Sequence, residues 1–350
     1  MGSGRNVKND KTWPLAAALL CIILVAAGCQ QGKSPDSSRG ADKAHGVAAS
    51  AHVPAITFGD KLYDVSLAEK GEAWAVGYFG KIVRTADGGK TWARQDGGTN
   101  RSLMGVHFVT RNEGWIVGEM GIVLHTKDGG STWEKQTSPV TKENLLKVQF
   151  VKEKEGLAVG SFGTIIRTND GGVTWERLPF KEDVTLNDLV FLSPAEGWIA
   201  GEFETILYTA DGGRTWKKQW GDKEGRLFGI AFSDTRNGVA VGTTGRILIT
   251  DNGGKSWKEV KGPTEDTLLK VQFHGASQAT AIGLRGTVLA TEDKGKTWSV
   301  VALPNHYTWL SGISFKKDGA GILVGDAGKI FMTIDNGKNW LLSGAYGQKE

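Results

Sequence analysis

The chain has 350 residues and a formal net charge of +4, with basic and acidic side chains interspersed along it. A charge this small and evenly spread argues against nucleic acid as a partner. Its two cysteines are Cys21 and Cys29, which excludes a disulfide or a cysteine metal site from everything after residue 29.

Residues 1–28 have the pattern of a lipoprotein-type signal peptide. A polar, basic start is followed by an apolar run over residues 14–28, which is shorter than the roughly 20 apolar residues that span a membrane. The run ends in A-A-G-C, which resembles a bacterial lipobox and predicts lipidation of Cys29. Ala26 stands where that motif prefers leucine, so plain secretion and an uncleaved anchor are alternatives.

Residues 29–54 are rich in Ser, Gly, Ala, Lys and Asp and predict a flexible tether. The folded domain is therefore expected over residues 55–350. Together these segments predict an extracytoplasmic, membrane-anchored lipoprotein, on the periplasmic face or the cell surface.

Seven tryptophans then recur at intervals of 41 or 42 residues: Trp92, Trp133, Trp175, Trp216, Trp257, Trp298 and Trp340. A fixed period in this range indicates a repeat architecture. Each tryptophan ends a box of which the first copy reads T-A-D-G-G-K-T-W, and the box position three holds Asp87, Asp128, Asp170, Asp211, Asn252, Asp293 and Asp335.

The box predicts a tight hairpin turn. Thr and Asp side chains can hydrogen-bond to nearby backbone groups, and Gly supplies positive φ. Because the seven acidic positions belong to seven separate turns, they cannot converge on one catalytic centre. We therefore predict a structural role for the box residues.

Each repeat contains four short strand-like segments. In the first copy they are L-Y-D-V-S-L, W-A-V-G, K-I-V-R-T and T-W-A-R-Q, and the first of them alternates with period two. Four strands per repeat fit one propeller blade. The sequence predicts an all-β fold, a seven-bladed β-propeller with four antiparallel strands per blade; whether residues 55–58 add a strand to blade seven is open.

The eight-residue box resembles the Asp-box, also called the BNR repeat. Over about residues 56–345 the repeat resembles the photosystem II stability and assembly factor family. The resemblance implies a seven-bladed propeller that helps to assemble or stabilise a membrane protein complex, photosystem II in photosynthetic members. Asp-boxes also occur in sialidases, xyloglucan hydrolases and sorting receptors, so the box specifies the fold more than the function.

Antiparallel topology places the box turns at one end of each blade. The G-x-x-G turns between the second and third strands, and the connections between blades, lie at the opposite end, which is the usual ligand face of propellers by analogy. Here the repeats diverge, and exposed aromatic residues are typical of protein–protein hot spots. The predicted partner-binding residues are Tyr78, Phe79, Glu119, Met120, Phe162, Glu202, Phe203 and Arg285 on the turns, with Trp220, Tyr307 and Trp309 in the connections. The alternative is that these side chains fold inward and cover the blade ends.

The inner strand also projects side chains into the central channel. Two Asp and two Lys are expected there, namely Asp64, Lys147, Asp188 and Lys270. They predict a wet channel that neutralises its own charge, with a small-ligand or ion site as the alternative.

We predict no catalytic residue, no cofactor and no metal site. Retaining glycoside hydrolysis needs two carboxylates about 5–5.5 Å apart, and nothing in the spacing pairs Glu119, Glu202 or Glu204; the F-R-I-P motif usual in sialidases is absent. The sequence predicts a non-enzymatic, tethered propeller whose partners are a protein client and, through its lipid, the membrane. A glycan-binding or sialidase-like propeller and a purely structural surface lipoprotein are the alternatives.

Overall fold

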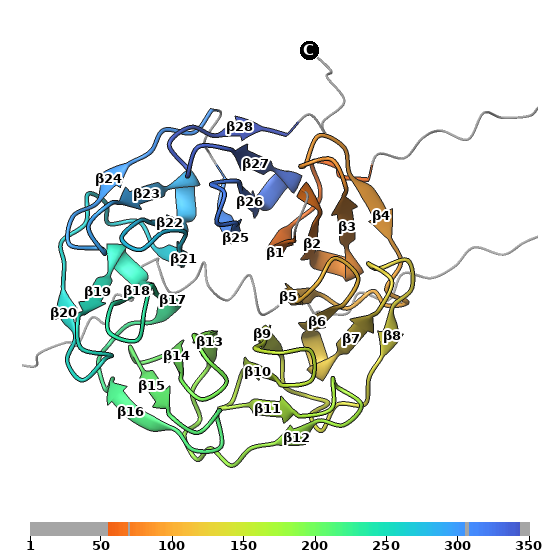
Figure 1. Ribbon diagram of the computed structural model, residues 1–350, viewed down its shortest axis with the longest axis horizontal. Coiled ribbons are helices and arrows are strands. Elements are labelled where there is room, and N and C mark those ends of the chain that lie inside the picture. The colour runs from red at the N-terminus through yellow and green to blue at the C-terminus, as the bar shows by residue number, and fades with distance from the viewer. Residues whose placement is uncertain (1–54, 69–70, 305–307, 344–350) are drawn as a thin grey trace, which may run out of the picture. The chain divides into compact units, whose positions relative to one another are not determined.

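The computed structural model describes residues 55–68, 71–304 and 308–343. They form seven four-stranded antiparallel sheets, arranged as blades around a central channel (Figure 1). The predicted seven-bladed β-propeller is confirmed. The predicted signal peptide, tether, Cys29 and Tyr307 lie outside the described residues.

Within every blade the strands follow chain order from the channel outward (Figure 1). Blade one contains β1 (Leu62–Leu67), β2 (Ala73–Gly77), β3 (Ile82–Thr85) and β4 (Ala93–Gln95). Blade two contains β5 (Leu103–Phe108), β6 (Gly114–Gly118), β7 (Val123–Thr126) and β8 (Glu134–Lys135). Blade three contains β9 (Leu145–Phe150), β10 (Gly156–Gly160), β11 (Ile165–Thr168) and β12 (Glu176–Arg177). Blade four contains β13 (Leu186–Phe191), β14 (Gly197–Gly201), β15 (Ile206–Thr209) and β16 (Lys217–Trp220).

The remaining blades repeat this order. Blade five contains β17 (Leu227–Phe232), β18 (Gly238–Gly242), β19 (Ile247–Thr250) and β20 (Lys258–Glu259). Blade six contains β21 (Leu268–Phe273), β22 (Ala279–Gly283), β23 (Val288–Thr291) and β24 (Ser299–Val300). Blade seven contains β25 (Leu310–Phe315), β26 (Gly321–Gly325), β27 (Ile330–Thr333) and β28 (Leu341–Leu342).

In five blades the turn between the second and third strands is a single 3₁₀ turn. These turns are η2 (Tyr78–Gly80), η3 (Glu119–Gly121), η4 (Thr243–Gly245), η5 (Leu284–Gly286) and η6 (Asp326–Gly328). Each consists of the last three residues of a predicted G-x-x-G turn and lies at the expected place in the blade.

The tryptophan period has a packing cause. In blade two the ring of Trp133 meets the ring of Phe108, the last residue of the inner strand, edge to face at 5.9 Å. The same contact recurs in blades three, four, five and seven with ring separations of 5.6–6.1 Å. Edge-to-face aromatic pairs are favourable beyond the area they bury. The box tryptophan therefore holds the outer hairpin of a blade against its inner strand.

Blade seven closes the ring without exchanging a strand, because all four of its strands come from one repeat. Residues before β1 take the place of an inter-blade connector instead: the carbonyl of Asp60 accepts the N–H of Gly328 at 2.7 Å, and Ile56 is buried beside Leu62 and Ile330. Across the same junction, Leu67 N–H donates to Ser314 Oγ at 3.0 Å. Residues 55–58 add no strand to blade seven.

Candidate functional site

The box residues form seven near-identical turns. In blade four, Asp211 Oδ1 accepts from the Thr209 hydroxyl at 2.8 Å and from the Thr215 N–H at 2.9 Å, and Thr209 Oγ accepts from the Gly213 N–H at 2.9 Å. The Thr215 hydroxyl and N–H both stabilise the carboxylate and lower the pKa of Asp211 to about 2. The carboxylate is therefore fully engaged in its own turn.

Blade five shows that this turn does not need a charge. Asn252 Oδ1 accepts from the Thr250 hydroxyl at 2.9 Å and from the Ser256 N–H at 3.0 Å, and its amide donates to Ser256 Oγ at 2.8 Å. The amide reproduces the contacts of the carboxylate, as expected of a turn residue and not of a general acid.

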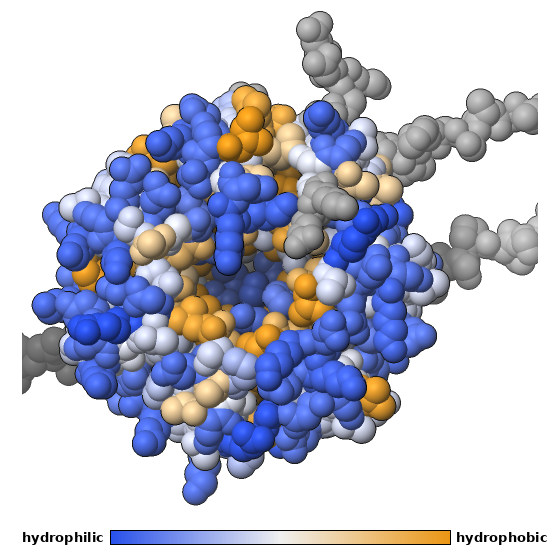
Figure 2. Space-filling view, in the orientation of Figure 1, coloured by the Kyte–Doolittle hydropathy of each residue, from blue (hydrophilic) through white to orange (hydrophobic). Residues whose placement is uncertain are grey.

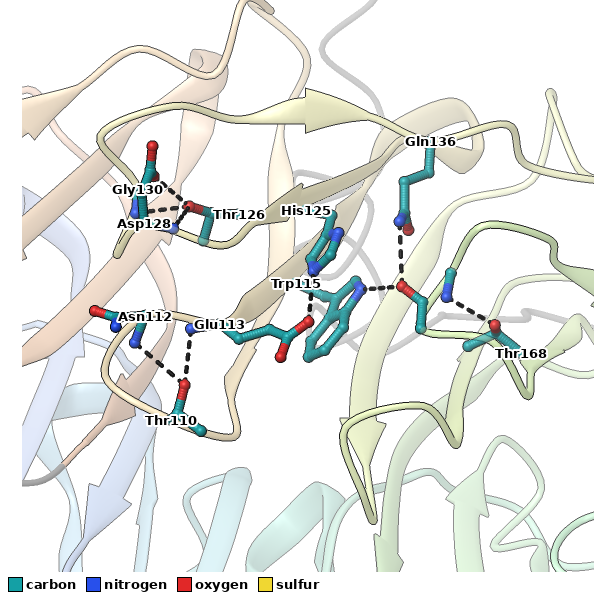
Figure 3. A network of polar contacts seen from close by, with 12 residues as sticks. Thr110, Asn112, Glu113, Trp115, His125, Thr126, Asp128, Gly130, Gln136 and Thr168 are labelled. Atoms are coloured by element: carbon teal, nitrogen blue, oxygen red, sulfur yellow. Dashed lines mark hydrogen bonds and ion pairs between the residues drawn. The ribbon is translucent and has the colours of Figure 1, made fainter.

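The box face also contains the contacts that join one blade to the next. In Figure 3, the indole N–H of Trp115 in blade two and the amide of Gln136 both donate to the carbonyl of Gly171, at 3.2 and 3.3 Å, in the box turn of blade three. The ring of His125 stacks on Trp115 at 4.5 Å, and its Nε2 lies 3.2 Å from Glu113 Oε1. Burial lowers the pKa of His125, which opposes the raising effect of Glu113. These buried contacts hold blades two and three at a fixed spacing.

Two shallow grooves open on this face between neighbouring blades, each with a volume of about 480 Å³. One, between blades six and seven, is lined by His274, Trp298 and Lys338. The other, between blades one and two, is lined by Trp92, Arg94 and other outer-strand residues. Among the described residues, no group of three or more His, Cys, Asp or Glu side chains is placed to hold a metal ion.

The central channel is lined by polar side chains that pair with each other. Lys147 Nζ in blade three reaches past Gly105 of blade two to Asp64 Oδ2 in blade one, at 2.9 Å. Lys270 reaches Asp188 across blade five in the same way, at 3.2 Å. The face drawn in Figure 2 has a central hollow with hydrophilic residues at depth and apolar residues on its rim. The four charges predicted for the channel therefore form two ion pairs.

A second set of channel residues bridges adjacent inner strands. Ser66 Oγ accepts the N–H of Phe108 at 3.0 Å, His107 Nδ1 that of Phe150 at 3.2 Å, and Gln149 Oε1 that of Phe191 at 2.9 Å. These bonds satisfy backbone donors that have no partner within their own sheet. The polar channel thus contributes to the cohesion of the ring.

His107 makes these hydrogen bonds between inner strands sensitive to acid. Burial, followed by the neighbouring Lys147 ammonium, lowers the pKa of His107 from 6.5 to about 4. Between pH 6.5 and pH 4 the imidazole therefore binds a proton in the unfolded chain but not in the folded protein. The free energy of unfolding falls as the pH drops through this range, by up to about 3 kcal/mol.

We expect His107→Gln to remove this part of the acid sensitivity, because a glutamine can accept the Phe150 N–H as Gln149 accepts that of Phe191. Urea unfolding at pH 7 and pH 4.5 measures the difference between the two proteins. Equal acid sensitivity in both would show that His107 is not the responsible group.

The opposite face is marked by a repeated strained conformation. The second interior residue of the G-x-x-G turn has left-handed backbone geometry, with φ between 53° and 57°, in all seven blades: Phe79, Met120, Phe162, Phe203, Thr244, Arg285 and Ala327. This conformation suits Gly and Asn, and costs other residues roughly 1 kcal/mol or more. None of the seven positions holds Gly or Asn.

In blades one to four this position displays apolar side chains to solvent. The exposed fractions are 61% for Phe79, 42% for Met120, 63% for Phe162 and 54% for Phe203, and the adjacent Tyr78 is 42% exposed. We call these five residues the apolar crescent. The corresponding positions in blades five to seven are Thr244, Arg285 and Ala327, so the apolar character covers only part of the ring.

The remaining residues predicted on this face lie in different settings. Glu119 and Glu202 each accept a backbone N–H of the preceding connector, from Ser102 at 3.2 Å and from Thr185 at 2.6 Å. Arg285 is largely exposed and lies 3.3 Å from Asp266. Glu119 and Glu202 therefore fasten the connectors as well as facing the surface.

Of the two described tryptophans predicted to lie in connections, Trp309 does so and Trp220 does not. Trp220 is the last residue of β16 and is half-buried, so its assignment to a loop was wrong. Trp309 immediately precedes β25 and is half-buried, with Lys61 Nζ at 5.5 Å from its ring centre. Neither tryptophan is therefore among the strongly exposed side chains of this face, whereas the residues of the apolar crescent are.

Among the described residues no helix is long and apolar enough to cross a membrane. The family model of the photosynthesis system II assembly factor YCF48 matches residues 49–139, 135–222 and 220–343. No curated protein is similar enough to match the chain.

Solved structures with the same fold include two of that family. A structure of YCF48 bound to a D1 peptide has a TM-score of 0.68 and 23% identity, over 80% of this chain and 93% of that one. YCF48 from Cyanidioschyzon merolae has a TM-score of 0.67 and 20% identity, over 79% and 96%. The GH74 xyloglucanase from Xanthomonas campestris has a TM-score of 0.65 and 14% identity, over 81% of this chain and 53% of that one. At these identities the structural likeness shows the fold alone.

Proposed function

The chain belongs to the photosynthesis system II assembly factor YCF48 family, and on that premise we propose that it is a non-enzymatic propeller tethered to a membrane. In this proposal the apolar crescent binds a segment of a membrane protein client. A YCF48 of this fold has been seen bound to a D1 peptide. D1, or a protein equivalent to it, is the client class we assign to this chain.

One observation carries the choice of surface. Three phenylalanines occupy left-handed backbone positions, and each exposes more than half of its surface. Such residues add strain to the folded state and gain little from burial within it. Their retention supports a role in contact with a partner, in which exposed aromatic side chains become buried anchors.

Calorimetric titration tests this proposal. The protein starting at residue 55 is titrated with overlapping synthetic peptides that cover the segments of D1 outside the membrane. We expect one region to bind with a dissociation constant on the order of 10 µM, and its scrambled version not to bind. Equal binding of scrambled and native peptides, or of none, would contradict the assigned client.

The tether is a separate part of the proposal and rests on the lipobox-like A-A-G-C sequence at Cys29. We expect palmitate label to enter the protein in cells and to disappear in Cys29→Ala. Substitution of Cys21, which lies inside the apolar run, is the matched control and should leave the label in place. Unlabelled wild-type protein would contradict the lipid anchor and leave the proposed client surface unaffected.

A further inference from the structure

Glu204 occupies a position at which every other blade has glycine. The last residue of the G-x-x-G turn is Gly80, Gly121, Gly163, Gly245, Gly286 or Gly328 in the other blades, with φ of 60–72°. Glu204 has φ of 54° and is 1% exposed, and it directly follows the left-handed Phe203. Blade four thus holds two consecutive strained residues, one of them a buried carboxylate.

The side chain of Glu204 is held by two neighbouring segments. Its Oε1 lies 2.8 Å from Arg246 Nε in blade five, and its Oε2 accepts from the indole N–H of Trp220 at 3.3 Å. Arg246 also pairs with Glu259 at 2.5 Å. Glu204 therefore joins blade four, the connector that follows it and blade five.

The consequence is a different path for the connector over residues 221–226, which follows β16. In other blades a connector carbonyl occupies the space that a Cβ would need: the Thr99 oxygen would lie 1.9 Å from a Cβ at Gly80, and the Thr264 oxygen 2.0 Å from one at Gly245. Glu204 has a Cβ, so its connector cannot take that path. Trp216 and Leu227 are 11 residues apart, as are Trp257 and Leu268, so no insertion accounts for the change.

The diverted connector has its own unusual backbone and its own contacts with the turn. Asp222 is left-handed with φ of 60°, and Gly221 and Gly225 have φ of 151° and 130°. The Lys223 N–H donates to the carbonyl of Phe203 at 3.3 Å, while the exposed Lys223 ammonium lies 3.8 Å from the centre of the Trp220 ring. The backbone of Lys223 is thereby held to that of Phe203, and its ammonium to the ring of Trp220.

We propose that Glu204 is a positioning residue for the client-binding face: it diverts connector 221–226, so that Trp220 at the end of β16 and Lys223 in the connector complete the blade-four end of the apolar crescent. This inference rests on the proposed function. Glycine would form the same turn without backbone strain or a buried charge, as it does in the other six blades. Backbone strain at a position where the fold does not require it points to a role in binding.

The test compares Glu204→Gly with Glu259→Gln, which changes the other partner of Arg246 and leaves the turn intact. In Glu204→Gly we expect a melting temperature within about 3 °C of wild type, and hydrogen exchange over residues 217–226 faster by about tenfold. We expect affinity for the D1 peptide that wild type binds to be about tenfold lower. Glu259→Gln should match wild type in all three measurements.

Glu204→Gln supplies the conservative variant, because it retains the side chain that blocks the connector path. It should bind the peptide within about threefold of wild type; binding as weak as that of Glu204→Gly would overturn the steric explanation. Unchanged exchange in Glu204→Gly would overturn the diversion of the connector. Faster hydrogen exchange in Glu204→Gly with unchanged affinity for the peptide would overturn the role of Glu204 in binding. The proposed function would still stand if variants of the apolar crescent lose affinity for the peptide.

Discussion

Simultaneous replacement of Phe79, Phe162 and Phe203 by asparagine is expected to abolish client binding while leaving the propeller as stable as before. Truncation of an aromatic anchor costs 2 kcal/mol or more at a typical hot spot, so the triple variant should bind at least about 100-fold more weakly. Asparagine tolerates left-handed backbone better than phenylalanine. We therefore expect an unchanged or slightly higher melting temperature, measured alongside calorimetric titration with the D1 peptide.

The same backbone position offers a matched control in a blade outside the apolar crescent. Thr244 in blade five has φ of 53°, so Thr244→Asn makes the same conformational change without removing an exposed ring. It should bind the peptide as wild type does. If the triple variant retained its affinity, or if Thr244→Asn lost it equally, the binding surface would lie elsewhere on the propeller.

Loss of binding with unchanged stability would distinguish this surface from the core. At buried positions a large-to-small change lowers both stability and activity, because the cavity weakens the whole fold. Phe108 illustrates this: it is 8% exposed and stacks on Trp74 at 3.6 Å. A phenylalanine whose loss weakens binding and spares the fold must serve a contact outside the monomer.

The fold could be predicted from the sequence because each blade buries the same parts in the same way. Trp133 and Phe108 meet in a contact that recurs in other blades, and the box turn closes on itself through short-range hydrogen bonds. Such local, repeated interactions leave a periodic trace in the residues. The paired charges of the channel were also predictable, because inner-strand alternation assigns Asp64 and Lys147 to one surface.

The corner around Glu204 could not be predicted in the same way. Alignment of the repeats marks Glu204 as the exception to glycine, but its partner Arg246 belongs to the next repeat and Trp220 to the end of β16. Since the connector has the ordinary length, nothing in the spacing reveals its different path. The error in placing Trp220 has this cause: β16 extends to residue 220, whereas β20 in blade five ends two residues after its box tryptophan, at Glu259.

Removing the ammonium of Lys147 is expected to give the largest loss of stability among single changes in the channel. Asp64 is 2% exposed and its Oδ2 accepts from Lys147 Nζ at 2.9 Å and from the Val106 N–H at 3.1 Å. Lys147→Met leaves this carboxylate buried with only the backbone donor. Breaking a buried ion pair in this way typically costs 3–5 kcal/mol, and we expect about 3 kcal/mol from urea unfolding because the channel admits some water.

A second substitution separates the charge from the packing. Asn at position 64 can still accept the Val106 N–H and carries no charge, so Asp64→Asn combined with Lys147→Met should recover most of the loss, to within about 1 kcal/mol of wild type. The pair Asp188 and Lys270 on the other side of the channel remains intact in both variants. If the double variant were as unstable as Lys147→Met, the lysine stem and not its charge would be what stabilises the ring. Recovery would instead show that Lys147 stabilises the ring by compensating the buried charge of Asp64, which bridges to blade two through the Val106 N–H.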